Sequence, residues 1–209
     1  MRNLMCLTMV LLAALAVQAR AQSETDENSA ANTGIAIFAG GCFWCVEADF
    51  DKVDGVKETV SGYIGGKEDN PTYKTHVANG DREAVRITYD PSTVSYDELL
   101  KTFFRTVDPT DDGGQFCDRG FSYTTAVYTL NPAQAEAARE AKAEAGEALG
   151  KPVVTEIADA TEFWPAEEYH QNYYKKNPIR YRYYRYGCGR DGRIEALWGP
   201  AANYGLEKS

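Results

Sequence analysis

The sequence predicts an α/β or α+β domain with a mixed, mostly antiparallel sheet. Strand-like and helix-like segments are interspersed along the chain, but they do not alternate strictly, as they would around a parallel sheet. Turn signals such as Asp54-Gly55, Asp108-Pro109 and Asn131-Pro132 separate these segments. Once a leader is removed, 188 of the 209 residues remain, enough for one domain with a full-sized core.

The first 21 residues have the pattern of a secretory signal peptide. Arg2 precedes an apolar stretch over 4–17, and Ala19-Arg20-Ala21 fits the small-x-small cleavage rule. The stretch is too short for a membrane anchor, which needs about 20 apolar residues. We therefore expect cleavage after Ala21 and a mature protein that is exported, to a bacterial periplasm, with no membrane contact once processed. Residues 22–32 are polar and acidic, which predicts a disordered linker.

The first half of the mature chain carries alternating and apolar segments separated by glycine. These predict a strand over 33–39, a helix over 43–53, a strand over 56–63, a long glycine-rich loop to residue 80 and a strand over 83–89. Ser95 followed by Glu98 forms a capping-box pattern, which starts a helix that ends before Asp108.

The second half begins with a loop over 110–122 and a strand over 123–130. Asn131 and Pro132 suit the N-cap and first position of an alanine-rich helix over 133–149. A strand over 153–157 and a helix over 166–176 follow. We interpret the tyrosine-rich segment beyond 178 as a tail that packs on the body, so the catalytic domain is 33–186 and a C-terminal segment is 187–209.

The chain is organised around Gly40-Gly41-Cys42, which links the first strand to the first helix. The first turn of a helix offers unpaired N–H groups and the positive end of the helix dipole. A thiolate there is stabilised, so we expect the pKa of Cys42 to fall below the free value of about 8.5. Cys45 lies one helical turn further on. The alternative is that Cys42 is a buried structural cysteine.

The cysteine spacing leaves two further functions open. Cys42 and Cys45 form a Cys-x-x-Cys pair, as in a thioredoxin-like disulfide oxidoreductase. Cys42, Cys45, Cys117 and Cys188 could also bind zinc, although the last two are isolated rather than paired. The formal net charge is −9, and −11 without the leader and its two arginines, which argues against nucleic acid as a partner.

Several chemically versatile side chains fall in the first turn and the two loops: Cys42, Phe43, Trp44, Tyr73, Glu83, Asp118 and Tyr123. A nucleophile, an apolar cage and proton donors suit a substrate with a soft electrophilic centre, a small apolar group and a polar oxygen.

With these residues the chain resembles the peptide methionine sulfoxide reductase A family, and the resemblance extends from about residue 35 to residue 186. The matching blocks occur in order: Gly41-Cys42-Phe43-Trp44, Gly62-Tyr63-Ile64-Gly65-Gly66 with Asn70-Pro71-Thr72-Tyr73, Glu83-Ala84-Val85-Arg86-Ile87, Asp118-Arg119-Gly120-Phe121-Ser122-Tyr123 and Tyr169-His170-Gln171. Within the last block we assign His170 a packing role.

The resemblance implies a two-layer sandwich with a ferredoxin-like core and an enzyme that reduces the S epimer of methionine sulfoxide, free or in oxidised proteins. Cys42 would attack the sulfoxide sulfur, and Phe43 and Trp44 would cage the methyl group. Glu83 would protonate the oxygen, Tyr73 and Tyr123 would hold it, and Asp118 would orient the site. The resemblance implies no metal or organic cofactor, and a thioredoxin-like dithiol as reductant. We expect a monomer.

The cysteines depart from the commoner family pattern. Many members have glycine in place of Cys45, and Cys117 is not the usual residue before Asp118. Cys188 lies in a glycine-rich segment where the family often keeps a resolving cysteine. We therefore expect Cys188 to be the cysteine that resolves Cys42, and Cys45 is the second choice. Cys117 could instead form a second disulfide. The loop between Gly80 and Glu83 is also short compared with many relatives.

Overall fold

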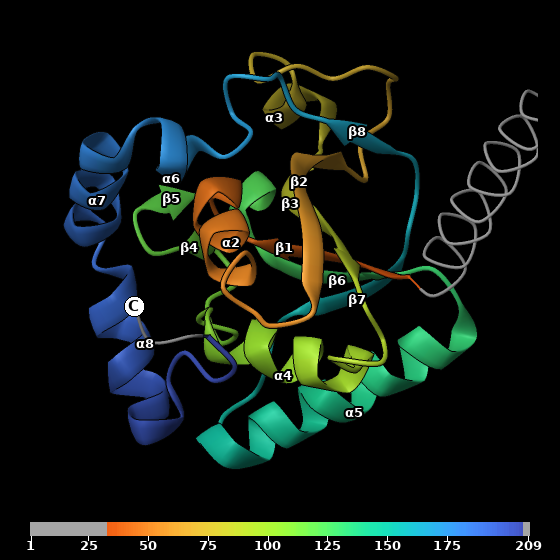
Figure 1. Cartoon of the computed structure of the whole chain (residues 1–209), viewed down its shortest axis with the longest axis vertical. Coiled ribbons are helices and arrows are strands. Elements are labelled where there is room, and N and C mark those ends of the chain that lie inside the picture. Colours follow the sequence, from red (N-terminus) through yellow and green to blue (C-terminus); the bar gives the residue numbers. More distant parts are fainter. Residues whose placement is uncertain (1–32, 207–209) are drawn as a thin grey trace, which may run out of the picture. The chain divides into compact units, whose positions relative to one another are not determined.

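The structure is a computed structural model that describes residues 33–206 (Figure 1). The predicted signal peptide and the linker lie outside the described residues. Within the described part of the chain, no helix is both long enough and apolar enough to cross a membrane.

Four antiparallel strands and two helices form the core of the fold. They are β1 (Gly34–Gly40), α2 (Phe43–Phe50), β2 (Val56–Ile64), β3 (Arg82–Tyr89), α4 (Tyr96–Arg105) and β6 (Thr125–Thr129). The strand order β6-β1-β3-β2, with antiparallel neighbours throughout, is the split β-α-β arrangement of a ferredoxin-like fold. The predicted fold class is therefore confirmed.

Two short strands extend the sheet at its edges. β7 (Glu156–Asp159) pairs with β6 and is the one parallel neighbour of the sheet in the described chain, and β8 (Phe163–Pro165) pairs antiparallel with β2. The sequence analysis did not predict β8, because three residues are too few to show an alternating pattern and Pro165 disfavours a strand.

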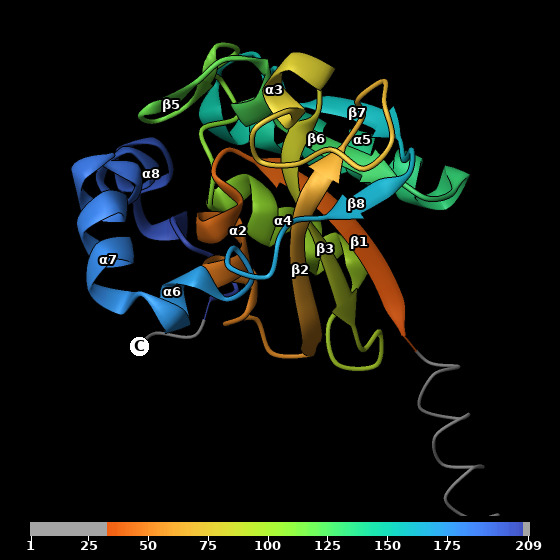
Figure 2. The same ribbon diagram turned by 90° about the horizontal axis from the view of Figure 1, so that it is seen from above.

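Strand β1 is buried on both faces, which explains its continuous apolar sequence. Ala36 and Phe38 belong to the larger core, which α2, α4 and α5 (Pro132–Leu149) cover, whereas Ile37 and Ala39 belong to a smaller cluster on the opposite face. Phe38 stacks on Phe103 of α4 with ring centroids 4.9 Å apart. Figure 2 shows these helices beside the twisted sheet.

The predicted helix ends are confirmed. Ser95 accepts a hydrogen bond from the Glu98 N–H, and the Glu98 carboxylate accepts one from the Ser95 N–H, which completes the capping box of α4. Asn131 caps α5 through the Gln134 N–H, and Gly150 ends it in the left-handed conformation.

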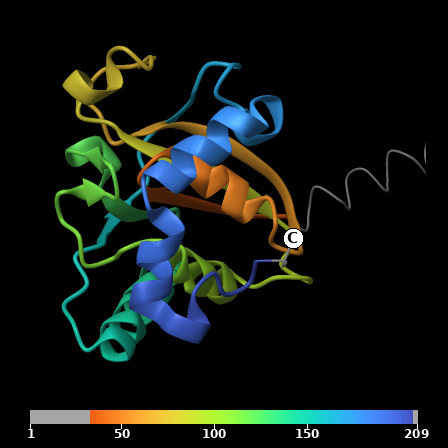
Figure 3. The ribbon, with the colours of Figure 1, turned by 90° about the vertical axis from the view of Figure 1, so that its left-hand side faces the viewer.

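The C-terminal region packs on the body as predicted, but it is helical where the sequence analysis expected only a tail. It contains α6 (Tyr173–Lys176), α7 (Pro178–Gly187), α8 (Arg190–Trp198) and the 3₁₀ helix η2 (Gly199–Ala201). Figure 3 shows α7 lying against α2, where Arg185 pairs with the buried Asp49 at 2.8 Å. Of the helix expected over 166–176, only α6 is present.

The two long loops contain short elements of their own. The first holds α3 (His76–Asn79), and the second holds the hairpin β4 (Gly114–Gln115) and β5 (Asp118–Arg119), followed by η1 (Phe121–Tyr123). The hairpin lies near α7 and α8 in Figures 1 and 2.

Candidate active site

A sharp turn between β1 and α2 presents Cys42 as the N-cap of the helix. Gly41 has φ +83°, and a Cβ there would lie 2.5 Å from the Cβ of Gln115, so a side chain would fit neither the backbone nor the space. Gln115 is fixed in turn, because its side chain accepts the Asp108 N–H and donates to the Asp108 carbonyl. The predicted strand, turn, cysteine and helix are therefore present.

Cys42 lines a cavity of about 60 Å³ that also gathers side chains from the two long loops and from α7. Its lining residues are Cys42, Phe43, Trp44, Tyr73, Glu83, Asp118, Tyr123 and Tyr184. The structure thus brings together the predicted constellation and adds Tyr184. The sequence analysis missed Tyr184 because nothing in the pattern 181–186 distinguishes one tyrosine from the others.

Glu83 is held at the positive end of α2, beside Cys42. Its Oε2 accepts the Phe43 N–H at 3.0 Å, and only 2% of the residue is exposed. The pKa of Glu83 is raised to about 8, mainly by burial and also by the nearby Asp118 and Cys45, against the stabilising hydrogen bond from Phe43. Glu83 is therefore largely protonated at neutral pH and can donate a proton.

The thiols of Cys42 and Cys45 are both free and buried. Burial, with a hydrogen bond to Cys45, raises the pKa of Cys42, so the predicted lowering was wrong for the resting site. The reason is local: the Cys42 thiol is buried, and the Phe43 N–H at the helix start is bonded to Glu83 rather than free for a thiolate. The hydrogen bond from Cys42 lowers the pKa of Cys45 to about 7, with help from Arg190 and Arg185.

Aromatic rings form the wall around Trp44. Its indole lies flat on Tyr173 with ring centroids 3.8 Å apart, and its Nε1–H donates to His170 Nδ1 at 3.1 Å. His170 is buried and packs on the Phe43 ring at 5.0 Å, so its surroundings are those of the packing role we assigned to it. The acceptor position of Nδ1 makes His170 a neutral imidazole with its proton on Nε2.

The polar side of the cavity comes from three tyrosines and Asp118. Burial raises the pKa values of Tyr73, Tyr123 and Tyr184, so their hydroxyls stay protonated as donors. Burial also raises the pKa of Asp118, whose carboxylate accepts the Tyr184 hydroxyl. Tyr73 is 42% exposed and stands at the edge of the cavity.

The remaining two cysteines are joined in a Cys117–Cys188 disulfide, with their Cα atoms 4.9 Å apart. Cys188 is the C-cap of α7, between that helix and α8. In this state Cys188 is bonded to Cys117 and not to Cys42. The four-cysteine zinc site is also wrong: the candidate metal group in the described chain is Cys117, Asp118 and Cys188, without Cys42 or Cys45.

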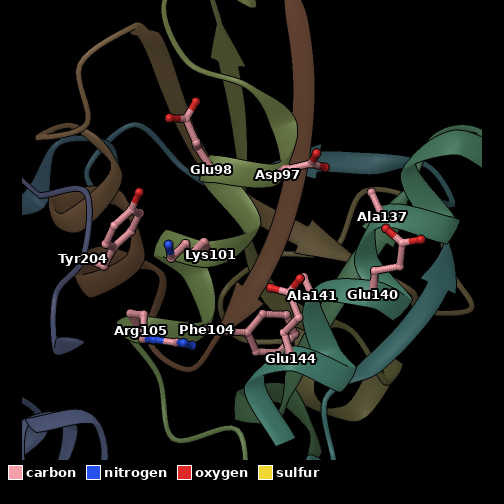
Figure 4. Close-up of a pocket in the computed structure, with 10 residues that line it drawn as sticks. All are labelled: Asp97, Glu98, Lys101, Phe104, Arg105, Ala137, Glu140, Ala141, Glu144 and Tyr204. Carbon is pink, nitrogen blue, oxygen red and sulfur yellow. The ribbon is translucent and has the colours of Figure 1, made fainter. Parts of the chain in front are cut away.

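A larger cavity of about 220 Å³ lies between α4 and α5 (Figure 4). Asp97, Glu98, Glu140 and Glu144 surround it, with Lys101 held over the Tyr204 ring at 4.2 Å. None of its lining residues is a cysteine or histidine, so the thiol chemistry of this chain belongs to the smaller cavity.

Two thiols one helical turn apart, beside a carboxyl group that keeps its proton, are the components of a thiol-based oxidoreductase for a small polar group. The comparisons with known proteins define that class further. The family model described as "Peptide methionine sulfoxide reductase" matches residues 34–201. The chain therefore belongs to the peptide methionine sulfoxide reductase family.

The relatives place it with the A type of that family. Peptide methionine sulfoxide reductase MsrA 2 of Rhizobium meliloti is 58% identical over 177 residues, covering 85% of this chain and 89% of the relative. The structure of Mxr1 from Saccharomyces cerevisiae in reduced form is 31% identical, with a TM-score of 0.68, covering 71% of this chain and 88% of Mxr1. Methionine sulfoxide reductase A of Corynebacterium diphtheriae is 33% identical, with a TM-score of 0.67, covering 71% of this chain and 76% of that one. The chain is thus an oxidoreductase that reduces methionine sulfoxide.

Proposed function

We propose that the chain reduces methionine-S-sulfoxide, free or in oxidised proteins, with Cys42 as nucleophile and Glu83 as general acid. The observation that carries this assignment is the Phe43 N–H hydrogen bond to Glu83 at 3.0 Å, which holds a protonated carboxyl group beside the thiol in one small cavity. Phe43 and Trp44 provide the apolar wall for the methyl group. Tyr73 and Tyr123 provide hydroxyls for the sulfoxide oxygen, and Asp118 orients the site.

In the first step the Cys42 sulfur attacks the sulfoxide sulfur while Glu83 gives its proton to the oxygen. The Cys42 proton passes to Cys45, to which the Cys42 thiol is already hydrogen-bonded and whose pKa is the lower of the two. The hydroxyl formed on the substrate then moves to the Cys42 sulfur as the substrate's sulfur–oxygen bond and the bond between the two sulfurs break, so methionine leaves as the thioether and Cys42 becomes a sulfenic acid. The substrate gains the two electrons that the thiol loses.

In the second step a resolving cysteine attacks the sulfenic acid, a disulfide forms, and water leaves. We favour Cys45 over Cys188 for this step, because Cys45 is free and hydrogen-bonded to Cys42, whereas Cys188 is bonded to Cys117. This reverses the order expected from the sequence.

We further propose that a thioredoxin-like dithiol reduces the new disulfide and returns two thiols. Its two sulfurs supply the electrons, so the cycle needs no metal or organic cofactor. Family membership supports this reductant, and Mxr1 of Saccharomyces cerevisiae has been solved in complex with Trx2. The pattern of residues 1–21 supports the proposal that the protein works after export, in a periplasm.

A single-turnover experiment tests the assignment. One equivalent of the S-epimer sulfoxide is added to the reduced protein, the reaction is quenched, and methionine and disulfides are measured by mass spectrometry. We expect one equivalent of methionine and a Cys42–Cys45 disulfide. Cys42→Ser should release none, and Cys45→Ser, the matched control, should release one equivalent and keep a sulfenic acid. Methionine released by Cys42→Ser would refute the nucleophile.

A thioredoxin-like disulfide oxidoreductase is the competing interpretation of Cys42 and Cys45. It predicts fast reduction of insulin disulfides and little sulfoxide turnover, so the same protein preparation distinguishes the two. The family match over residues 34–201 favours the sulfoxide reductase.

A further inference from the structure

The Cys117–Cys188 disulfide connects two segments that each deliver a side chain to the active-site cavity. Cys117 directly precedes Asp118 in the turn between β4 and β5. Cys188 lies one helical turn beyond Tyr184, and its N–H donates to the Tyr184 carbonyl at 2.9 Å. The Tyr184 hydroxyl then donates to Asp118, so a covalent link and a hydrogen bond join the same two segments side by side.

We propose that this disulfide is a staple that holds Asp118 against Tyr184 beside Cys42, and that it stays oxidised while the Cys42 and Cys45 pair cycles. The proposal rests on the proposed function and names a positioning element for that same site. It assigns the disulfide no part in electron transfer.

Side-chain contacts other than the disulfide anchor α7 and α8 to the body of the protein. Arg190 is buried and donates to the Gly40 carbonyl at 3.2 Å and the Thr106 carbonyl at 2.9 Å, while Arg185 pairs with Asp49. Trp198 adds a hydrogen bond to the Val107 carbonyl at 3.3 Å. The two helices are therefore anchored to the body without the disulfide.

The tip of the β4–β5 hairpin has fewer attachments. Its base is fixed by the buried Gln115 and by a salt bridge between Arg119 and Asp111 at 2.6 Å. At the tip, Phe116 lies under the Arg190 guanidinium at 4.8 Å, and the next residue but one, Asp118, pairs with Gln115 in the hairpin and accepts the Tyr184 hydroxyl through its carboxylate. Loss of the disulfide should therefore release the tip, and with it the Asp118 carboxylate, while α7 and α8 stay in place.

The same arrangement separates the disulfide from the reacting thiol. Asp118 and Tyr184 both line the Cys42 cavity, and the Tyr184 hydroxyl interacts with the Cys42 thiol. The two cysteines also line a separate cavity of about 620 Å³ together with Asp108, Asp111 and Asp112. Cys45 is hydrogen-bonded to Cys42 directly, so the site already contains a resolving thiol that needs no movement of Asp118 or Tyr184.

The kinetic test compares Cys117→Ser/Cys188→Ser with Tyr184→Phe, which keeps the disulfide but removes the hydrogen bond to Asp118. Each should lower kcat/KM for the S-epimer sulfoxide by up to about tenfold, the usual effect of one hydrogen bond. The variant that combines all three substitutions should have a kcat/KM no lower than that of the less active of the two separate variants. The reason is that both changes act through the position of Asp118. Multiplied losses, or an unchanged kcat/KM in the cysteine variant, would overturn the staple.

A second measurement uses the unaltered protein and so does not depend on how a variant folds. During steady turnover with thioredoxin, samples are trapped with an alkylating reagent and each cysteine is quantified. We expect Cys42 and Cys45 to be alkylated in part, and Cys117 and Cys188 to stay unlabelled. Alkylated Cys117 or Cys188, or a peptide that links either to Cys42, would show that this disulfide carries electrons. Absence of methionine would instead count against the proposed function itself.

Discussion

Replacement of Glu83 by glutamine should change how the stability of the protein depends on pH. The pKa of Glu83 rises from its usual 4.5 to about 8 in the folded state. Between these values the unfolded chain releases the proton and the folded chain keeps it. The contribution of Glu83 to the free energy of unfolding is therefore fully present below about pH 4.5 and is lost as pH rises towards about 8. At about 1.4 kcal/mol per pH unit, the wild type should lose roughly 4 kcal/mol between about pH 5 and pH 8. Glutamine does not titrate and loses nothing.

Urea unfolding of both proteins at about pH 5, 6.5 and 8 measures this difference. Glu47, whose pKa burial raises to about 7, titrates in both proteins, so its contribution cancels. The free energy of unfolding of the wild type should therefore fall relative to that of Glu83→Gln by roughly 4 kcal/mol as pH rises over this range. In parallel, the kcat/KM of the wild type should fall above about pH 8 as Glu83 ionises. Glu83→Gln should keep much of the activity and show no fall in kcat/KM above about pH 8. Glu83→Ala should lose most of the activity. Parallel stability curves for wild type and Glu83→Gln would refute the raised pKa.

Three further predictions concern packing and cross-links. The Cys117–Cys188 disulfide joins residues 71 apart, so Cys117→Ser/Cys188→Ser should lower the free energy of unfolding by about 4 kcal/mol on the chain-entropy estimate, measured by urea unfolding without reductant; a loss below about 1 kcal/mol would contradict it. Ser95→Ala removes the hydroxyl that accepts the Glu98 N–H in the α4 capping box, while the Ser95 N–H bond to the Glu98 carboxylate remains, and should cost about 1 kcal/mol of stability with kcat/KM unchanged. Trp44→Phe removes the hydrogen bond to His170 and part of the stack on Tyr173, so kcat/KM should fall about fivefold, by about 1 kcal/mol; an undiminished value would show that this wall does not hold substrate.

Much of the core could be predicted because local and tertiary signals agree there. The run 35–39 is apolar throughout since β1 is buried on both faces, and Ser95 and Asn131 cap their helices through contacts three residues away. Such features depend on residues that are close together in the sequence, so a local pattern predicts them. The cavity residues came from recognisable blocks of the sequence.

The C-terminal helices could not be predicted because their stability is not local. Helix α7 leaves Tyr183 and Tyr186 more than 80% exposed and has no apolar stripe, and it is held by Arg185 on Asp49 and by the buried Tyr181. The cysteine pairing was hidden for the same reason, since spacing alone does not determine connectivity. The pKa of Cys42 was predicted in the wrong direction because Glu83, forty residues away in sequence, takes the N–H that would have served the thiolate.

The buried Arg190 has a consequence for the order in which the enzyme becomes competent. Its guanidinium binds the carbonyl of Gly40, 150 residues earlier in the chain, and Tyr184 covers Cys42 from the same late segment. During synthesis, Cys42 and Cys45 are made long before Tyr184 and Arg190. Until the later segment is made, both thiols are uncovered and can react with oxidants or with other cysteines. Residues 184–190 must therefore be synthesised before the reactive sulfur is covered, so the C-terminal helices protect a nucleophile that was made much earlier in the chain.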